Sequence, residues 1–189
     1  MFDLENKDEE SAFYELDSDR GVAIIATAIV ENRLTDLLKA AMTQDEETFK
    51  ELFRPGGALG DFGNKIKLAY LLGLIHEDVQ KDLNRVAKIR NAFAHRVSIK
   101  SFDDQSIKDS VQNLSALKLW EAALDKLEKR IKQDDSTGED VRLSAQILRG
   151  ELSTVRDSFR MCLRLYIQKL ITTEKAVKHW SAKRPAPEP

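Results

Sequence analysis

The sequence contains very few of the residues that brace small secreted proteins or hold structural metals. It has one cysteine, Cys162, and this excludes an internal disulfide framework. The three histidines are His76, His95 and His179, and they form no cluster with the cysteine at metal-ligand spacing. We therefore expect neither a metal site nor a cofactor.

Proline and glycine are also scarce, with four and eight residues in a chain of 189. This leaves little turn material for a many-stranded sheet and favours helices. The length favours one domain with a single sizeable core. The composition therefore predicts an all-α protein, a single helical bundle of about five to six helices that ends in a long C-terminal helix.

Long apolar runs and an excess of one charge are absent as well. The longest apolar run, "GVAIIATAIV" at residues 21–30, is too short to span a bilayer, and the N-terminus has no signal pattern. We expect a cytoplasmic protein with no membrane partner. The net charge of −2 gives no general reason to expect nucleic acid, although residues 81–100 are rich in Lys and Arg and predict a local basic patch.

The composition divides the chain into three parts. Residues 1–18 are strongly acidic and are interpreted as an N-terminal arm. Residues 19–180 carry helical periodicity and form the predicted helical domain. Residues 181–189, "SAKRPAPEP", have the composition of a disordered tail.

Apolar periodicity predicts the individual helices of this domain. We expect helices over residues 20–42, 45–52, 61–73, 76–97, 105–133 and 141–180. Ser18 or Asp19 is placed to cap the first helix and Asp61 the third. The last helix is long enough to form part of an oligomer interface, so we predict a homodimer. Trp120 and Trp180 are interpreted as core or interface anchors.

The clearest break in the chain is "RPGGALG" at residues 54–60. A glycine-rich loop before a helix can bind phosphate. This loop lacks the Lys-Ser/Thr ending of a nucleotide-binding P-loop, so we interpret it as a turn.

The stretch "RVAKIRNAFAHR" at residues 85–96 places an arginine within an apolar row. Steps of four and three residues connect Val79, Leu83, Val86, Arg90, Phe93 and Val97. A charge on a core face requires a partner, because its desolvation is costly. Glu31 lies inside an apolar helix in the same way, so we predict a structural ion pair between Glu31 and Arg90, with Asp61 as the other candidate partner.

Two stretches resemble the mannitol operon repressor family, an all-helical group of bacterial proteins. They are "GALGDFGNKIKLAYLLGLI" followed by "DLNRVAKIRNAFAH", and the earlier "IVENRLTDLLKA". The resemblance implies a non-enzymatic protein that regulates transcription of genes for sugar uptake or metabolism. The sequence shows no helix-turn-helix signature, so we expect regulation through protein contacts. The partner that the resemblance implies is a phosphotransferase carrier protein.

The alternative function comes from "RNAFAH", which has the form Arg-Asn-x-x-x-His and resembles the active motif of HEPN domains. This resemblance implies a metal-independent endoribonuclease of the toxin or defence type. His95 would transfer a proton, Arg90 would hold the phosphate, and Asn91 would orient either His95 or the substrate. Arg90 and His95 lie on different faces of one helix, so this chemistry requires a partner helix from a homodimer. The surrounding RNA-binding cations would be Lys81, Arg85, Lys88 and Arg96.

The motif residues also have simpler interpretations. A histidine near the end of a helix stabilises the last turn by its charge, without any catalysis. A helical module that binds RNA without cleaving it would keep the basic helix and lose the chemistry. The sequence alone leaves these alternatives open.

Overall fold

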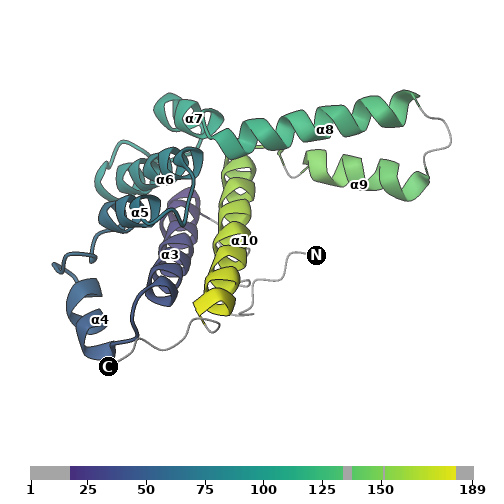
Figure 1. The fold of residues 1–189 in the computed structure, drawn as a ribbon. Coiled ribbons are helices and arrows are strands. Elements are labelled where there is room, and N and C mark those ends of the chain that lie inside the picture. Colours follow the sequence, from purple (N-terminus) through teal and green to yellow (C-terminus); the bar gives the residue numbers. More distant parts are fainter. Residues whose placement is uncertain (1–17, 134–137, 151, 182–189) are drawn as a thin grey trace.

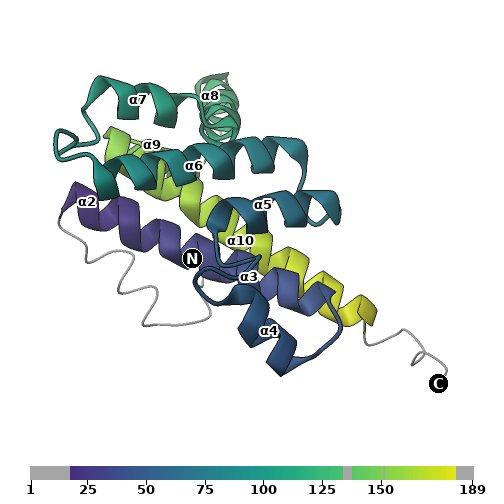
Figure 2. The same ribbon diagram turned by 90° about the vertical axis from the view of Figure 1, so that its left-hand side faces the viewer.

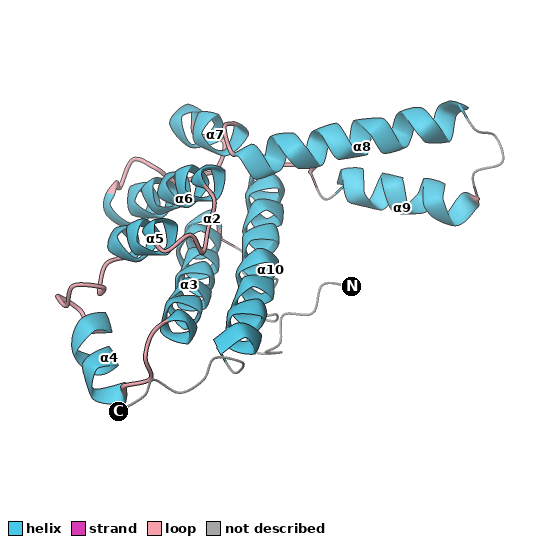
Figure 3. Ribbon diagram, in the orientation of Figure 1, coloured by secondary structure: helices cyan, strands magenta, loops and turns pink. Residues whose placement is uncertain are grey.

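The computed structural model describes residues 18–133, 138–150 and 152–181, and every regular element in these ranges is a helix (Figure 3). The predicted all-α, single-domain fold is confirmed. Residues 1–17 of the predicted arm and 182–189 of the predicted tail lie outside the described residues. Within the described ranges, no helix combines the length and the apolarity needed to cross a membrane.

Two long helices, α3 (Thr27–Ala41) and α10 (Val155–Ser181), run side by side through the centre of the bundle (Figures 1 and 2). A short helix α2 (Asp19–Gly21) and a π-helical turn η1 (Val22–Ala26) lead directly into α3. Fully buried leucines such as Leu34 and Leu163 recur at helical spacing on the facing sides. The predicted first helix is therefore confirmed, with a π turn inside it.

The helices α4 (Glu46–Phe53), α5 (Phe62–Leu71) and α6 (Glu77–His95) follow in order. Figure 1 shows α5 and α6 together on one side of the α3–α10 pair. The Asp61 carboxylate accepts a hydrogen bond from the Gly63 backbone N–H at 3.3 Å, which confirms the predicted cap of α5. The Ser18 Oγ accepts from Gly21 N–H at 3.0 Å and caps the first helix.

The turn between α4 and α5 requires its glycines for steric reasons. A Cβ on Gly57 would lie 2.5 Å from the backbone oxygens of Glu51 and Leu52. These oxygens belong to the backbone, so they cannot move aside as the end of a flexible side chain can. The tight chain reversal therefore accounts for the glycine-rich stretch.

Two helices that the sequence predicts as continuous are each broken in the structure. The predicted helix 105–133 divides into α7 (Gln105–Gln112) and α8 (Ser115–Gln133). At the break, the Asn113 side-chain amide donates to the Asp109 carbonyl at 2.9 Å, and Leu114 is fully buried. A side chain that binds the backbone in this way competes with helix continuation.

The predicted helix 141–180 is likewise wrong as a single helix. It divides into α9 (Glu139–Gly150) and α10, and the Thr154 Oγ1 accepts from the Asp157 N–H at 3.1 Å as an N-cap of α10. Gly150 ends α9, consistent with the frequency of glycine at helix ends. These two breaks raise the number of helices above the predicted five to six.

Because of the second break, α8 and α9 form an arm that extends away from the bundle (Figure 1). Arg149 on α9 bonds the α8 carboxylates of Glu128 and Asp125, at 2.8 Å and 2.6 Å. Leu124 and Ala145 are buried within the arm. The arm brings the start of α8 against α6 and α10, where a hollow described below is formed.

Candidate functional site

The buried side of α6 includes four of the six residues of the predicted row, but it does not include Arg90. Its buried residues are Val79, Asp82, Leu83, Val86, Ile89, Ala92 and Phe93. Ile89 is only 1% exposed, whereas Arg90 is half-buried at the edge of this face. Val97 is 85% exposed, because α6 ends at His95.

The predicted ion pair between Glu31 and Arg90 is wrong. The Glu31 Oε1 accepts instead from the Lys65 Nζ at 2.8 Å, and both side chains are largely buried between α3 and α5. The Arg90 Nη1 donates to the Asn91 Oδ1 at 2.9 Å on the exposed side of α6. Asp61, the other candidate partner, caps α5.

A groove of about 430 Å³ between α6 and α7 brings most of the motif residues together. From α6 and the residue after it, the groove is lined by Lys88, Asn91, His95 and Arg96, and from α7 mainly by Ser106 and Ser110. We call this surface, defined by these six residues, the α6–α7 groove. Arg90 does not line it, but its bond to Asn91 holds the amide that does.

The four predicted basic residues separate into two pairs. Lys88 and Arg96 line the α6–α7 groove. Lys81 pairs with Glu77 at 2.6 Å, which raises the pKa of Lys81, and Arg85 pairs with Asp82 at 3.1 Å. The basic patch is thus shorter than the sequence predicts.

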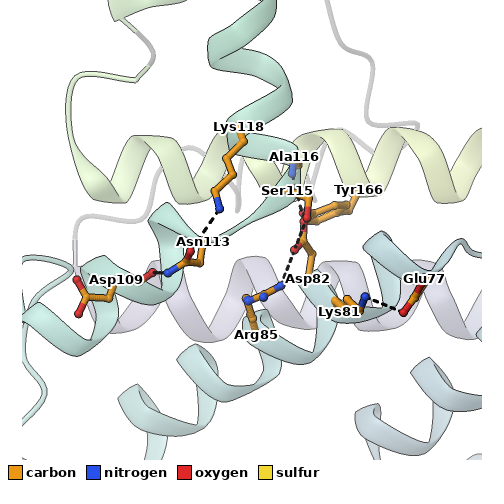
Figure 4. A network of polar contacts seen from close by, with 10 residues as sticks. All are labelled: Glu77, Lys81, Asp82, Arg85, Asp109, Asn113, Ser115, Ala116, Lys118 and Tyr166. Carbon is orange, nitrogen blue, oxygen red and sulfur yellow. Dashed lines mark hydrogen bonds and ion pairs between the residues drawn. The ribbon is translucent and has the colours of Figure 1, made fainter.

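Asp82 is the most constrained polar residue of the site, and Figure 4 shows its surroundings. It is 1% exposed, and its carboxylate accepts hydrogen bonds from the Tyr166 hydroxyl and the Arg85 guanidinium. It also accepts from the Ser115 Oγ at 3.3 Å and from the Ala116 N–H at 3.2 Å. A buried carboxylate is stable only when donors satisfy it, and these four donors come from α6, α8 and α10.

The same environment changes the acidity of two neighbours on α10. Burial and the hydrogen bond to Asp82 raise the pKa of Tyr166 far above its ordinary value. Burial, with smaller contributions from the charges of Asp82 and Glu121, raises the pKa of Cys162 to about 12. Both groups therefore remain protonated at neutral pH.

Sequence reasoning missed Asp82, although a signal was present. Residues 79, 82, 86, 89 and 93 also follow one another at steps of three and four, and this row contains Asp82 in place of Arg90. The buried charged residue of α6 is therefore Asp82 and not Arg90.

A hollow of about 730 Å³ lies beside this network, where the start of α6, the start of α8 and the middle of α10 meet. Its lining includes Glu77, Asp78, Leu119, Trp120, Leu165 and Lys169, and we call it the α6–α8–α10 hollow. Leu119 is 72% exposed, and the Trp120 Nε1 is buried without a hydrogen-bond partner. An exposed apolar surface beside two carboxylates is suited to binding another molecule.

Comparison with protein families decides what kind of protein carries these features. Residues 8–172 match the family model described as mannitol repressor. The chain belongs to the mannitol repressor family. The predicted resemblance is thereby confirmed, and the chain is a regulatory protein of the mannitol repressor type.

Two solved structures share this fold. The chain is similar to the MtlR–HPr complex from Escherichia coli, with a TM-score of 0.61 and 23% identity over 88% of this chain and 97% of that one. It is also similar to YggD from Shigella flexneri 2a str. 2457T, a possible transcriptional regulator, with a TM-score of 0.61 and 18% identity over 87% and 95%. A comparison with curated protein sequences finds no match. The HEPN resemblance is not tested by these matches and stays a prediction.

Proposed function

We propose that this mannitol repressor family member regulates through protein contact, by binding a phosphotransferase carrier protein of the HPr kind at the α6–α8–α10 hollow. Two observations support the proposal. The Escherichia coli protein with the same fold is described in complex with HPr. The hollow combines an exposed apolar residue with charged neighbours, the composition expected of a binding surface.

Leu119 is the residue that carries the proposed contact. It stands on the first turns of α8 with 72% of its surface exposed, beside the half-buried Trp120 and Leu165. Burying a leucine side chain contributes about 1.5–3 kcal/mol. A few well-placed apolar and aromatic residues supply most of the affinity at protein interfaces, so Leu119 and Trp120 are the expected centre of the interface.

The charges around the hollow select the partner. Glu77 and Asp78 occupy the first turn of α6 and stand at the edge of the hollow, while Lys169 lies on α10. Charge complementarity increases association rates and excludes like-charged partners. Since Glu77 is already paired with Lys81, the partner surface is expected to present an apolar side chain, with a Lys or Arg opposite Asp78 and a carboxylate opposite Lys169.

The test is a calorimetric titration of an HPr-type carrier protein into the parent chain and two variants. Leu119→Asp places a charge at the proposed centre and is expected to weaken binding at least about tenfold. Leu71→Asp is the matched control, because Leu71 is 78% exposed at the end of α5 and does not line the hollow. Equal affinities for both variants would show that the carrier binds elsewhere.

Metal-independent cleavage of RNA is the alternative function, because Asn91 and His95 line one groove with two cations. In that mechanism His95 transfers a proton, Asn91 orients the substrate, and Arg90 acts through Asn91 as a positioning residue. The homodimer that this chemistry requires is likewise a prediction, and a partner helix would have to face the same groove.

A further inference from the structure

We infer that the α6–α7 groove is a binding site for a small phosphorylated sugar, a ligand that would report metabolic state to this regulator. The inference does not depend on the proposed carrier protein, because the groove and the α6–α8–α10 hollow share no lining residue. It rests on the charge, the hydrogen-bonding groups and the size of the groove.

The charge of the groove is uncompensated. Lys88 and Arg96 line it, and none of its lining residues is a carboxylate. Neither cation forms an ion pair with a described residue, in contrast to Lys81 and Arg85 on the same helix. Two cations that line one groove without a counter-charge attract an anion, and a phosphate accepts several charge-assisted hydrogen bonds.

The remaining polar groups suit hydroxyl groups. Asn91 and His95 on α6 and the Ser106 and Ser110 hydroxyls on α7 line the same groove. The Ser110 Oγ donates to the Ser106 carbonyl at 2.7 Å, so its lone pairs remain to accept. Arg90 donates to the Asn91 Oδ1, so the Asn91 amide N–H groups remain as donors. Side chains that both donate and accept are the partners that sugar hydroxyls require.

The extent of the positive charge favours a small ligand over a nucleic acid strand. A polyanionic strand is bound along an extended basic groove, often with aromatic side chains on which bases stack. Here Glu77 and Asp82 neutralise the next two cations along α6, and no Phe, Tyr or Trp lines the groove. The volume of about 430 Å³ lies within the range of small-molecule sites.

The experiment titrates glucose 6-phosphate, sorbitol 6-phosphate, their unphosphorylated counterparts, inorganic phosphate and a short oligouridine into the full chain by calorimetry. The double variant K88Q/R96Q removes both groove cations. K126Q/K129Q removes two exposed cations from α8, far from the groove, and matches the change in net charge.

We expect a phosphorylated sugar to bind the parent and the α8 variant equally, and K88Q/R96Q to bind it at least about tenfold more weakly. The unphosphorylated sugars should not compete. The inference is overturned if neither phosphorylated sugar binds, or if K88Q/R96Q binds as the parent does. Inorganic phosphate that binds as tightly as the sugar phosphates contradicts the role of the hydroxyl-binding groups. Oligouridine that binds through Lys88 and Arg96 while the sugar phosphates fail contradicts the proposed ligand class.

Discussion

Replacement of Asp82 by alanine should destabilise the whole bundle, because this one carboxylate joins three helices. Its removal leaves the Tyr166 hydroxyl without an acceptor in a residue that is 3% exposed. It also leaves the Ala116 N–H unpaired at the start of α8. The Arg85 side chain is 38% exposed, so its guanidinium can regain water and contributes less to the loss.

The magnitude follows from these separate losses. A buried hydroxyl without a partner costs about 1–3 kcal/mol, and loss of an acceptor at a helix N-terminus costs about 0.5–2 kcal/mol. Their sum is consistent with the roughly 3–5 kcal/mol measured when one partner of a buried charge pair is removed. We therefore expect Asp82→Ala to lower the free energy of unfolding by about 3 kcal/mol, a large share of the total for a domain of this size.

Urea denaturation of a double-mutant cycle with Tyr166→Phe isolates the central bond. Phenylalanine removes the hydroxyl and leaves Asp82 with its other donors, so that variant should lose only about 1 kcal/mol. The double variant should lose less than the sum of the two single variants, since it leaves no stranded hydroxyl. Asp78→Ala, one turn earlier on α6 and exposed, is the control and should lose less than about 1 kcal/mol. An Asp82→Ala variant as stable as this control, or strict additivity in the cycle, would refute the reasoning.

Other predictions test separate parts of the account. Cys162 is fully buried and its pKa is raised to about 12. An aromatic disulfide reagent at pH 8 should therefore label it only as fast as the chain unfolds. Rapid stoichiometric labelling of the native protein would contradict this burial. The raised pKa of Tyr166 adds stability that is fully present below the ordinary tyrosine pKa of about 10 and is lost as the pH rises above it. In denaturation experiments at alkaline pH, Tyr166→Phe should therefore reduce the dependence of the unfolding free energy on pH. Gly57→Ala should destabilise by about 1–3 kcal/mol in thermal melts, whereas Gly63→Ala, whose Cβ would meet nothing within 4 Å, should be neutral or stabilising. Under the ribonuclease alternative, the parent should cleave mixed RNA in EDTA and His95→Ala should not; equal cleavage by both would remove His95 from any mechanism.

Local sequence signals predicted much of the fold. Asp61 begins α5 as expected, because its capping role depends only on residues next to it in the chain. The apolar periodicity located α3, α5 and α6 for the same reason. The breaks after residues 112 and 150 were missed, because apolar residues continue at helical spacing on both sides of each break.

The site was harder to predict because it depends on neighbours that are distant in sequence. Periodicity allowed two rows on α6, and only the packing of α8 and α10 shows that the row with Asp82 is the buried one. Glu31 was correctly recognised as a charge that needs a partner, but its partner Lys65 is set by the packing of α5 on α3. Of the three motif residues expected to act together, only Asn91 and His95 line the groove, and they do so because α7 packs beside α6, a contact between segments that local periodicity does not predict.

The measurement that tests the proposed function most directly follows the fluorescence of Trp120 during titration with an HPr-type carrier protein. The chain has two tryptophans, so the variant Trp180→Phe leaves Trp120 as the sole reporter, in the wall of the α6–α8–α10 hollow. We predict a saturable change in its emission, with a dissociation constant equal to the calorimetric one, and no change after Leu119→Asp. Two results would contradict the proposed function. One is constant emission while calorimetry shows that the carrier is bound, and the other is the absence of any binding.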